Sequence, residues 1–308
     1  MSAKEKAVAQ LVHMVWKGVS EDSGIYHATF FFDSQGRPAW GPQNKINGVG
    51  TSASPAITSF SGDVVPIPRT ELFMAWKGIP HDQGIYWSRD LGSQANVPHI
   101  GTSHGLALAP QPNQYIYMAW KGIEGDSGIY WSFNNLLHGL EGWAPQQNVR
   151  GVGTSDKPAL AYRFPKLYMA WKGIRGDSGI YCSINQGDSS WRPQHRVPNV
   201  GTSTGPALAF FKGALHMVWK GIEGDSGLYH ASSTDDGLNW TPQQRISGVG
   251  TSHSPALTVF NDRLIMAWKG IPGDSGLYFS SSLDGLHWDP QGKVPDVGSS
   301  DGPSLAVS

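Results

Sequence analysis

The chain has 308 residues, with 23 basic and 24 acidic side chains, and charged residues make up only 15% of it. This balance provides no charge field that could hold nucleic acid or an anionic membrane surface, so we do not expect polyanions as partners. Glycine (39), proline (21) and tryptophan (13) are abundant, which is typical of many short strands joined by tight turns.

The N-terminal residues show no targeting segment. Lys4, Glu5 and Lys6 precede a short apolar run that contains His13, and this run is too brief and too polar for a signal peptide. No stretch approaches the roughly 20 apolar residues of a membrane span, so membrane insertion is not expected. The single cysteine, Cys182, excludes an internal disulfide and favours a reducing compartment. We therefore predict a cytoplasmic protein, with export without a leader as the open alternative.

A repeated motif dominates the chain from Trp16 onward. The string Trp-Lys-Gly occurs six times, and each copy has an Asp six residues after the Trp and a Tyr four residues further on. A second block, Gly-Thr-Ser, occurs five times and reads Gly-Ser-Ser at its sixth position. Six copies of each block predict six units within one domain, residues 1–308. The Trp-Lys-Gly strings begin at Trp16, Trp76, Trp120, Trp171, Trp219 and Trp268.

Each unit is predicted to form four strands bounded by Gly, Pro, Asn and Asp. In the fourth unit these would be Pro158–Tyr162, Leu167–Trp171, Gly179–Ser183 and a segment around Trp191–Val197. Four strands per 44 to 60 residues is the period of a β-propeller blade. The expected fold is therefore an all-β, six-bladed propeller of antiparallel four-stranded blades.

The two ends of the chain predict how the ring closes. The last Gly-Ser-Ser block runs into Pro303–Ala306 and no further Trp-Lys-Gly follows, while the first Trp-Lys-Gly has no such block before it. The C-terminal strand should therefore complete the first blade and remove the open sheet edges.

Both repeated blocks are expected on one face of the ring, side by side. Trp-Lys-Gly ends the second strand of a blade, and Gly-Thr-Ser lies in the connection to the next blade. The other loops vary, from Phe211–Gly213 to the long Phe60–Glu71 connection, and are predicted to be plain connectors on the opposite face. The second unit is expected to have a shortened outer strand, because it lacks the Trp and Pro-Gln of the other units.

Each crevice between blades would then present a Trp, a Lys, an Asp and a Thr-Ser hydroxyl pair. This set suits a sugar, because hydroxyls need fixed donors and acceptors and the C–H face of a pyranose stacks on an aromatic ring. Six weak sites on one ring would bind a glycan-covered surface with high avidity. The candidate sugar-binding residues are Trp16, Lys17, Asp22, Thr51, Ser52, Trp76, Lys77, Asp82, Thr102, Ser103, Trp120, Lys121, Asp126, Thr154, Ser155, Trp171, Lys172, Asp177, Thr202, Ser203, Trp219, Lys220, Asp225, Thr251, Ser252, Trp268, Lys269, Asp274, Ser299 and Ser300.

Structural roles compete with this interpretation. The Trp and the mid-strand Tyr can be core between blades, and Asp and Ser near Gly can tie a turn to its own backbone. Six lysines are harder to explain by packing, since an ammonium is rarely buried without a partner, and an ion pair with the loop Asp is the alternative. As a sugar ligand, Lys172→Ala should lower avidity partially and leave folding intact.

Other motifs support the fold more than a reaction. Residues Ser233–Trp240 fit the Asp-box pattern Ser-x-Asp-x-Gly-x-x-Trp, and Ser282–Trp288 is a shortened relative. Such boxes resemble those of sialidases, where they are turns on the side away from the active site. The eleven histidines have no repeated metal-ligand spacing and the linear calcium loop is absent, so no metal or cofactor is expected.

The whole chain resembles lectin-type propellers, including tectonin-like and fucose-binding lectins, which are rings of repeated Trp-containing blades. The resemblance implies sugar sites between blades, but the repeated Lys stands where the fucose lectins commonly have Arg and Glu, so the sugar is not assigned. We therefore predict a multivalent lectin without catalytic residues, whose partners are glycans. The number of working crevices and the oligomeric state stay open.

Two other functions compete with the lectin. A sialidase-like glycosidase should break the symmetry with unique acidic and basic groups near the axis, and the ten arginines form no evident cluster on the repeated face. A protein-interaction scaffold should expose variable apolar residues, whereas the repeated face is expected to be uniform and polar.

Overall fold

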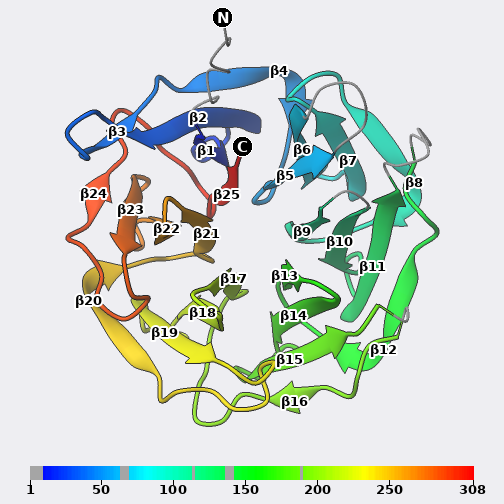
Figure 1. Ribbon diagram of the computed structural model, residues 1–308. Coiled ribbons are helices and arrows are strands. Elements are labelled where there is room, and N and C mark those ends of the chain that lie inside the picture. The colour runs from blue at the N-terminus through cyan, green and yellow to red at the C-terminus, as the bar shows by residue number, and fades with distance from the viewer. Residues whose placement is uncertain (1–9, 63–68, 113–114, 136–141, 188–189) are drawn as a thin grey trace, which may run out of the picture.

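The computed structural model describes residues 10–62, 69–112, 115–135, 142–187 and 190–308. These residues form a closed ring of six antiparallel sheets around a central axis, which confirms the expected all-β, six-bladed propeller (Figure 1). No helix long and apolar enough to cross a membrane occurs within these ranges.

Blades 2 to 6 each have four strands that run outward from the axis in chain order, and the sheet of blade 1 has five strands, with the C-terminal β25 innermost. Blade 1 is built of β25 (Ser304–Val307), β1 (Val12–Lys17), β2 (Gly24–Phe32), β3 (Pro38–Trp40) and β4 (Asn44–Gly50). Blade 2 is built of β5 (Ala56–Gly62), β6 (Arg69–Lys77), β7 (Gly84–Arg89) and β8 (Ala95–Gly101). Blade 3 is built of β9 (Leu106–Gln111), β10 (Tyr115–Lys121), β11 (Gly128–Asn135) and β12 (Gln147–Gly153).

The second half of the ring repeats this arrangement. Blade 4 is built of β13 (Ala159–Arg163), β14 (Lys166–Lys172), β15 (Ile180–Asn185) and β16 (His195–Arg196). Blade 5 is built of β17 (Ala207–Phe211), β18 (Ala214–Lys220), β19 (Gly227–Ser233) and β20 (Gln244–Gly250). Blade 6 is built of β21 (Ala256–Phe260), β22 (Arg263–Lys269), β23 (Leu277–Ser282) and β24 (Gly292–Lys293).

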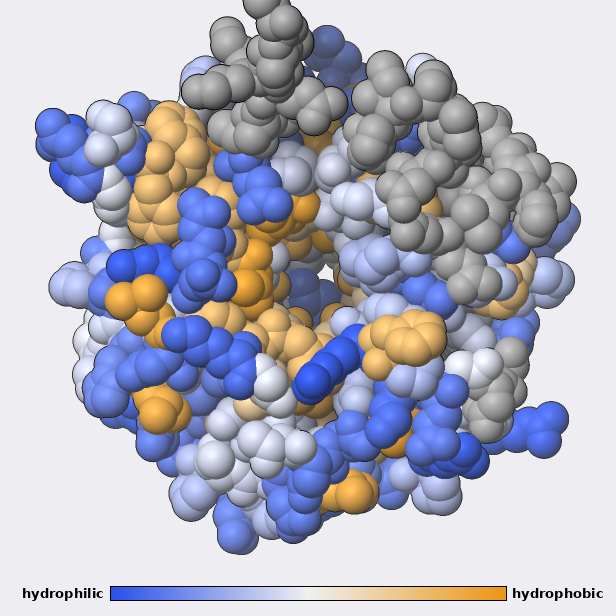
Figure 2. Space-filling view, viewed as in Figure 1, coloured by the Kyte–Doolittle hydropathy of each residue, from blue (hydrophilic) through white to orange (hydrophobic). Residues whose placement is uncertain are grey.

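The ring closes as predicted. The C-terminal strand β25 pairs antiparallel with β1, with Met14 opposite Leu305, and so provides the inner strand of blade 1. The inner strands contact one another around the axis, and their residues, such as Leu108, Leu208 and Leu257, line the central opening. Figure 2 shows apolar side chains gathered around that opening.

Two predictions about strands are corrected. The outer strand of blade 4 is only β16, much shorter than the predicted segment Trp191–Val197, although Trp191 bridges to Asn185. The second blade does not have a shortened outer strand, because β8 has seven residues, as many as β4, β12 and β20. The expected Phe60–Glu71 connection is largely strand at its two ends, and its residues 63–68 lie outside the described ranges.

The Trp-Lys-Gly loops turn tightly after the second strand. In each loop the residue before the Asp has a positive φ, and this residue is Gly in four blades but Glu21 and His81 in blades 1 and 2. A side chain in this left-handed region is strained, whereas Gly is not.

We expect His81→Gly to raise the free energy of unfolding by about 0.5 to 1 kcal/mol, because it removes this strain. The converse change, Gly125→Ala in blade 3, should lower it by a similar amount. Urea denaturation of both variants checks the pair, and equal midpoints for the two would contradict the assignment of strain.

The Asp-box forms the predicted turn between β19 and β20. The Ser233 hydroxyl oxygen accepts the Gly237 N–H at 2.9 Å, and Asp235 Oδ1 accepts the Asn239 N–H at 2.9 Å. Asp236, within the box, binds Lys166 and Tyr168 of blade 4. The box therefore holds two blades together at the end of the ring opposite the Trp-Lys-Gly loops.

Candidate functional site

The six repeated tryptophans are core residues. All six side chains are 0% exposed, and each ring stacks on the repeated Tyr of the same blade with centroids about 6 Å apart. No ring face is free for a pyranose, so the structure does not support the expected sugar contact. The residues concerned are Trp16, Trp76, Trp120, Trp171, Trp219 and Trp268.

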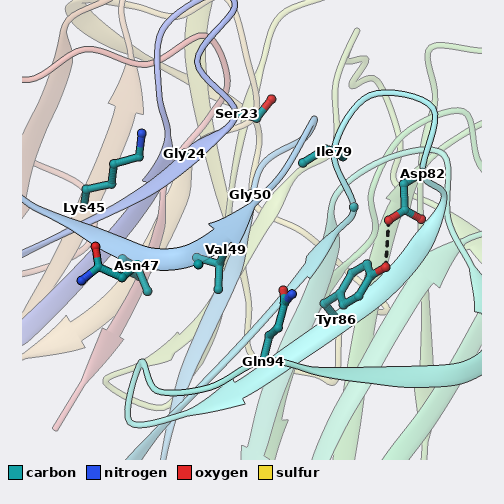
Figure 3. Close-up of a pocket in the computed structure, with 13 residues that line it drawn as sticks. Ser23, Gly24, Lys45, Asn47, Val49, Gly50, Ile79, Asp82, Tyr86 and Gln94 are labelled. Carbon is teal, nitrogen blue, oxygen red and sulfur yellow. Dashed lines mark hydrogen bonds between the residues drawn. The ribbon is translucent and has the colours of Figure 1, made fainter.

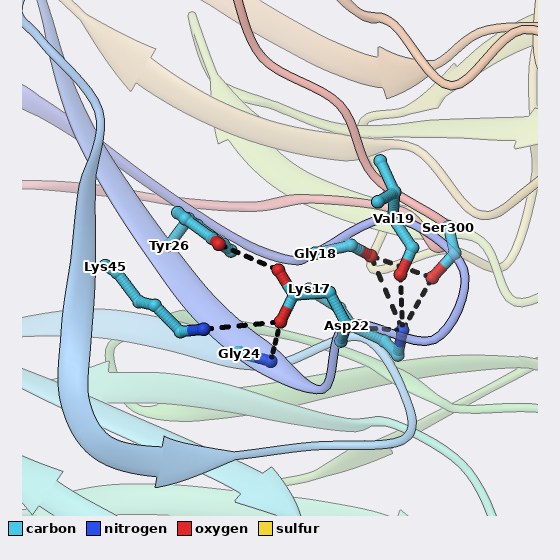
Figure 4. A network of polar contacts seen from close by, with 8 residues as sticks. All are labelled: Lys17, Gly18, Val19, Asp22, Gly24, Tyr26, Lys45 and Ser300. Carbon is cyan, nitrogen blue, oxygen red and sulfur yellow. Dashed lines mark hydrogen bonds and ion pairs between the residues drawn. The ribbon is translucent and has the colours of Figure 1, made fainter.

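The repeated lysines hold their own loops together, as Figure 4 shows for blade 1. Lys17 Nζ donates to the carbonyl oxygens of Asp22 at 3.0 Å and Val19 at 3.3 Å, and to Ser300 Oγ at 2.8 Å. The bond goes to the Asp22 carbonyl and not to its carboxylate, so the alternative of an ion pair is corrected as well. Burial lowers the pKa of this ammonium, while the charges of nearby carboxylates raise it. The same bonds to a loop Asp carbonyl and a connector Ser hydroxyl hold Lys77, Lys121, Lys172, Lys220 and Lys269.

The hydroxyls of the Gly-Thr-Ser block are also structural. Thr51 Oγ1 donates to the Ala53 carbonyl at 2.9 Å and accepts the Ala53 N–H, which closes the connection, and Ser52 Oγ donates to the Gly78 carbonyl of the next blade at 2.8 Å. These contacts confirm that the two repeated blocks lie side by side on one face, here called the motif face. The buried equivalents of Thr51 are Thr102, Thr154, Thr202, Thr251 and Ser299. The equivalents of Ser52 are Ser103, Ser155, Ser203, Ser252 and Ser300.

The repeated aspartates, in contrast, keep their carboxylates partly exposed. Asp82 Oδ1 accepts the Gly84 N–H at 2.8 Å and Oδ2 accepts the Tyr86 hydroxyl at 2.9 Å. In blade 4 the Gly179 N–H and the Tyr181 hydroxyl lower the pKa of Asp177 despite its partial burial. The repeated Tyr, expected in the core, is only partly buried. The same Asp–Tyr bond forms at Asp22, Asp126, Asp177, Asp225 and Asp274.

One position of each outer strand lies against this Asp–Tyr pair. In blade 1 Lys45 Nζ lies 3.4 Å from Asp22 Oδ1. Arg196, Arg245 and Lys293 likewise lower the pKa of the Asp in blades 4, 5 and 6. Blades 2 and 3 have a neutral amide at this position, Asn96 and Asn148. Four blades therefore present an anion beside a cation, and two present an anion beside an amide.

The line where blades 1 and 2 meet is called seam 1–2, and the other seams are named in the same way around the ring. Seam 1–2 holds a cavity of 610 Å³ (Figure 3). Lys45, Asn47 and Val49 of β4 line one side. The other side is lined by Ile79, Asp82, Tyr86 and Gln94 of blade 2. This volume suits a monosaccharide or disaccharide, and the lining mixes charged, amide and apolar groups.

Seam 3–4 holds a second cavity, of 940 Å³. Asn148 and Arg150 of β12 lie on one side, Trp191 and Gln194 of blade 4 lie on the other, and Trp131 contributes from β11. A charged group, amides and aromatic rings meet in this crevice, but the Asp–Tyr pair of blade 4 does not line it.

Two repeated residue types of the crevices were missed in the sequence. An exposed Gln begins the outer segment of every blade, and its recurrence after Pro or Ser was visible in the sequence. These residues are Gln43, Gln94, Gln146, Gln194, Gln243 and Gln291. The residue after Trp-Lys-Gly is about half exposed in every blade, so the expectation of a uniformly polar motif face is corrected. These residues are Val19, Ile79, Ile123, Ile174, Ile222 and Ile271.

The axis carries charged groups that break the symmetry. Lys157 Nζ donates to Ser54 Oγ at 2.8 Å, although the two residues come from connectors two blades apart, and it lines a small axial cavity of 90 Å³. Asp301 Oδ2 accepts the Ser54 N–H at 2.8 Å. Burial lowers the pKa of Lys157 and raises that of Asp156, two groups that also interact with Asp301. No charged group near the axis was predicted from the sequence.

Comparisons with known proteins agree with the fold. No protein-family model matches the chain, and a search of the curated proteins found no match either. The chain is similar to a mutant Aleuria aurantia lectin in complex with Fucα1-6GlcNAc, with a TM-score of 0.59 and 12% identity over 93% of this chain and 96% of that one. It is also similar to a mutant of AofleA from Arthrobotrys oligospora, with a TM-score of 0.62 and 11% identity over 96% and 86%.

An enzyme appears among the similar structures as well. A Hadza microbial sialidase matches with a TM-score of 0.56 and 12% identity over 80% of this chain and 59% of that chain. At such identities the likeness shows the fold alone, and the expected resemblance to lectin propellers is confirmed at that level.

Proposed function

We propose that this protein is a carbohydrate-binding lectin whose sugar sites are the crevices at the seams between blades. The observation that carries the proposal is a set of partly or fully exposed groups that recurs in each blade and lines the cavity at seam 1–2. This set comprises the Asp–Tyr pair, the Gln that begins the outer segment and the aliphatic residue after Trp-Lys-Gly. A carboxylate and amides can bind sugar hydroxyls, while Tyr and Ile offer apolar contact to the C–H face of a pyranose. Repetition around one ring would make binding multivalent.

This proposal replaces most of the residues predicted from the sequence. The Trp, Lys, Thr and Ser of the repeated blocks act as supports, and only the aspartates of the original set stay among the proposed ligands. The fold neighbours support a glycan partner, because the Aleuria lectin structure contains a fucosylated disaccharide. A glycan array followed by calorimetric titration tests the proposal, and the absence of binding to any glycan would refute it.

The exposed glutamines provide a sharper test. We expect Gln94→Ala to weaken sugar binding at seam 1–2 about fivefold, because one hydrogen bond is worth about 1 kcal/mol. In a calorimetric titration with methyl α-L-fucoside, or with the methyl glycoside that the array favours, the variant should lose one strong site. Gln35→Ala, at an exposed turn outside the crevices, is the matched control and should bind as the unchanged protein does. Equal isotherms for both variants would remove Gln94 from the site.

A glycoside hydrolase is the second candidate, and the axial cluster of Asp156, Lys157 and Asp301 favours it. Propeller enzymes need unique groups from different blades, which this cluster provides. Turnover of a fluorogenic glycoside that is abolished by Asp156→Asn would support the enzyme. The scaffold alternative and the cytoplasmic location stay predictions.

A further inference from the structure

The six outer segments fall into two alternating classes. In blades 1, 3 and 5 the segment ends in Gly-Val-Gly, whereas in blades 2, 4 and 6 a proline and a larger residue take the two positions before the Ile or Val. The first class comprises Asn47-Gly48-Val49, Arg150-Gly151-Val152 and Ser247-Gly248-Val249. The second class comprises Pro98-His99-Ile100, Pro198-Asn199-Val200 and Pro295-Asp296-Val297.

The central residue of the segment is left-handed in both classes, although the outer strands of blades 4 and 6, β16 and β24, have only two residues each. The central residue has a φ between 55° and 73° in all six blades. A Cβ placed on Gly48, Gly151 or Gly248 would meet no atom within 4 Å. Since Gly48 and Gly151 line the cavities of seams 1–2 and 3–4, this open space lies at the rim of the crevice. In the second class an imidazole, an amide or a carboxylate stands at the same rim.

Contacts across the seam also close the second class. At seam 2–3 the side chain of Gln83, which replaces the usual Ser, accepts the Glu124 N–H at 2.6 Å. At seam 6–1 the Gln43 amide donates to the Asp296 carbonyl at 3.0 Å and so bridges the crevice. At seam 4–5 Val200 is buried, at 9% exposed, whereas its equivalents Val49 and Val152 are partly exposed.

We propose that sugar binds at alternate seams only, so that the chain has three sites, at seams 1–2, 3–4 and 5–6. This inference rests on the proposed lectin function and deepens it. The glycine of each Gly-Val-Gly leaves the crevice mouth wide enough for a pyranoside, and the three rims differ by one polar side chain, Asn47, Arg150 or Ser247. The structural residues of the repeated blocks thus recur six times around the ring, whereas the proposed sugar sites recur three times.

Titration of the full chain with methyl α-L-fucoside, or with the array's preferred methyl glycoside, is expected to give three sites per chain. The double variant Asn47→Pro, Gly48→His gives seam 1–2 the Pro-His of seam 2–3, and it should reduce the count to two. Since His99 occupies this backbone conformation in blade 2, the variant should fold, and its thermal melting curve checks that.

The reverse exchange is the matched control. The double variant Pro198→Ser, Asn199→Gly gives seam 4–5 the Ser-Gly of seam 5–6. This protein is expected to bind sugar at no fewer than three sites. Six equivalent sites in the unchanged chain, or three sites retained by the Pro-His variant, would overturn the alternation while leaving the lectin proposal intact. No binding to any glycan would instead refute the lectin function itself.

Discussion

Replacing Lys220 with alanine is expected to lower the free energy of unfolding by about 2 to 4 kcal/mol, although this side chain belongs to the repeated motif face. Lys220 is 8% exposed, and its Nζ donates to Ser203 Oγ at 2.7 Å and to the Asp225 carbonyl at 2.9 Å. Without the ammonium, the Asp225 carbonyl loses this donor, and a buried acceptor left unpaired costs about 1 to 3 kcal/mol. Loss of the buried methylene groups adds to that cost.

The methionine variant separates these two effects. Lys220→Met keeps most of the apolar stem and should cost about 1 to 3 kcal/mol, which is the hydrogen-bonding part alone. Lys45→Met is the matched control, because that side chain is 54% exposed and its ion pair with Asp22 should contribute less than about 1 kcal/mol. Urea denaturation at pH 7.5 measures all three variants. A midpoint for Lys220→Met equal to that of the unchanged protein would contradict the structural role.

The same network changes the expectation for Lys172. Its Nζ donates to Ser155 Oγ at 2.6 Å and to the Asp177 carbonyl at 3.1 Å, so we now expect Lys172→Ala to destabilise the fold and not only to reduce avidity. A loss of sugar binding by this variant would therefore be uninformative unless its folding is measured as well.

The repeat predicted the ring but not which repeated groups are exposed. Six copies of Trp-Lys-Gly and the unmatched ends fixed the number of blades and the pairing of β25 with β1, because each copy must form the same hydrogen-bonded unit. A group required once per blade for folding recurs as regularly as one required once per site. Lys220 and Asp225 are equally repeated, yet the ammonium points into the loop and the carboxylate faces outward.

The shape of the crevices could not be predicted from the sequence, because it depends on how neighbouring blades pack. The alternation of Gly-Val-Gly with a segment that reads Pro, any residue, then Ile or Val was present in the sequence. Its meaning became clear only from the position of Gly48 at a crevice rim. Lys157 could likewise be read in the sequence, but nothing there placed it near the axis. Its contact with Ser54, 103 positions earlier, follows only from the closure of the ring.

Acid is expected to destabilise the protein between about pH 6.5 and pH 4, because of a buried histidine pair. His216 Nδ1 lies 2.9 Å from His230 Nε2, and the two side chains are 4% and 2% exposed. Burial, with a smaller contribution from His216, lowers the pKa of His230 to about 4. The unfolded chain binds a proton near pH 6.5 and the folded chain does not, so stability is complete above pH 6.5 and falls as the pH drops toward 4.

A double variant that copies two residues of blade 6 into blade 5 isolates the contribution of this histidine pair to the acid sensitivity. The equivalent positions there are Ile265 and Phe279, both buried, so His216→Ile, His230→Phe replaces the pair with a native apolar one. Between pH 7.5 and pH 4.5 we expect the unchanged protein to lose about 2 to 3 kcal/mol more stability than this variant. Urea midpoints at the two pH values measure the difference. The blade 1 pair, His13 with His27, is kept in both proteins, so a parallel loss in both would assign the acid sensitivity to other groups.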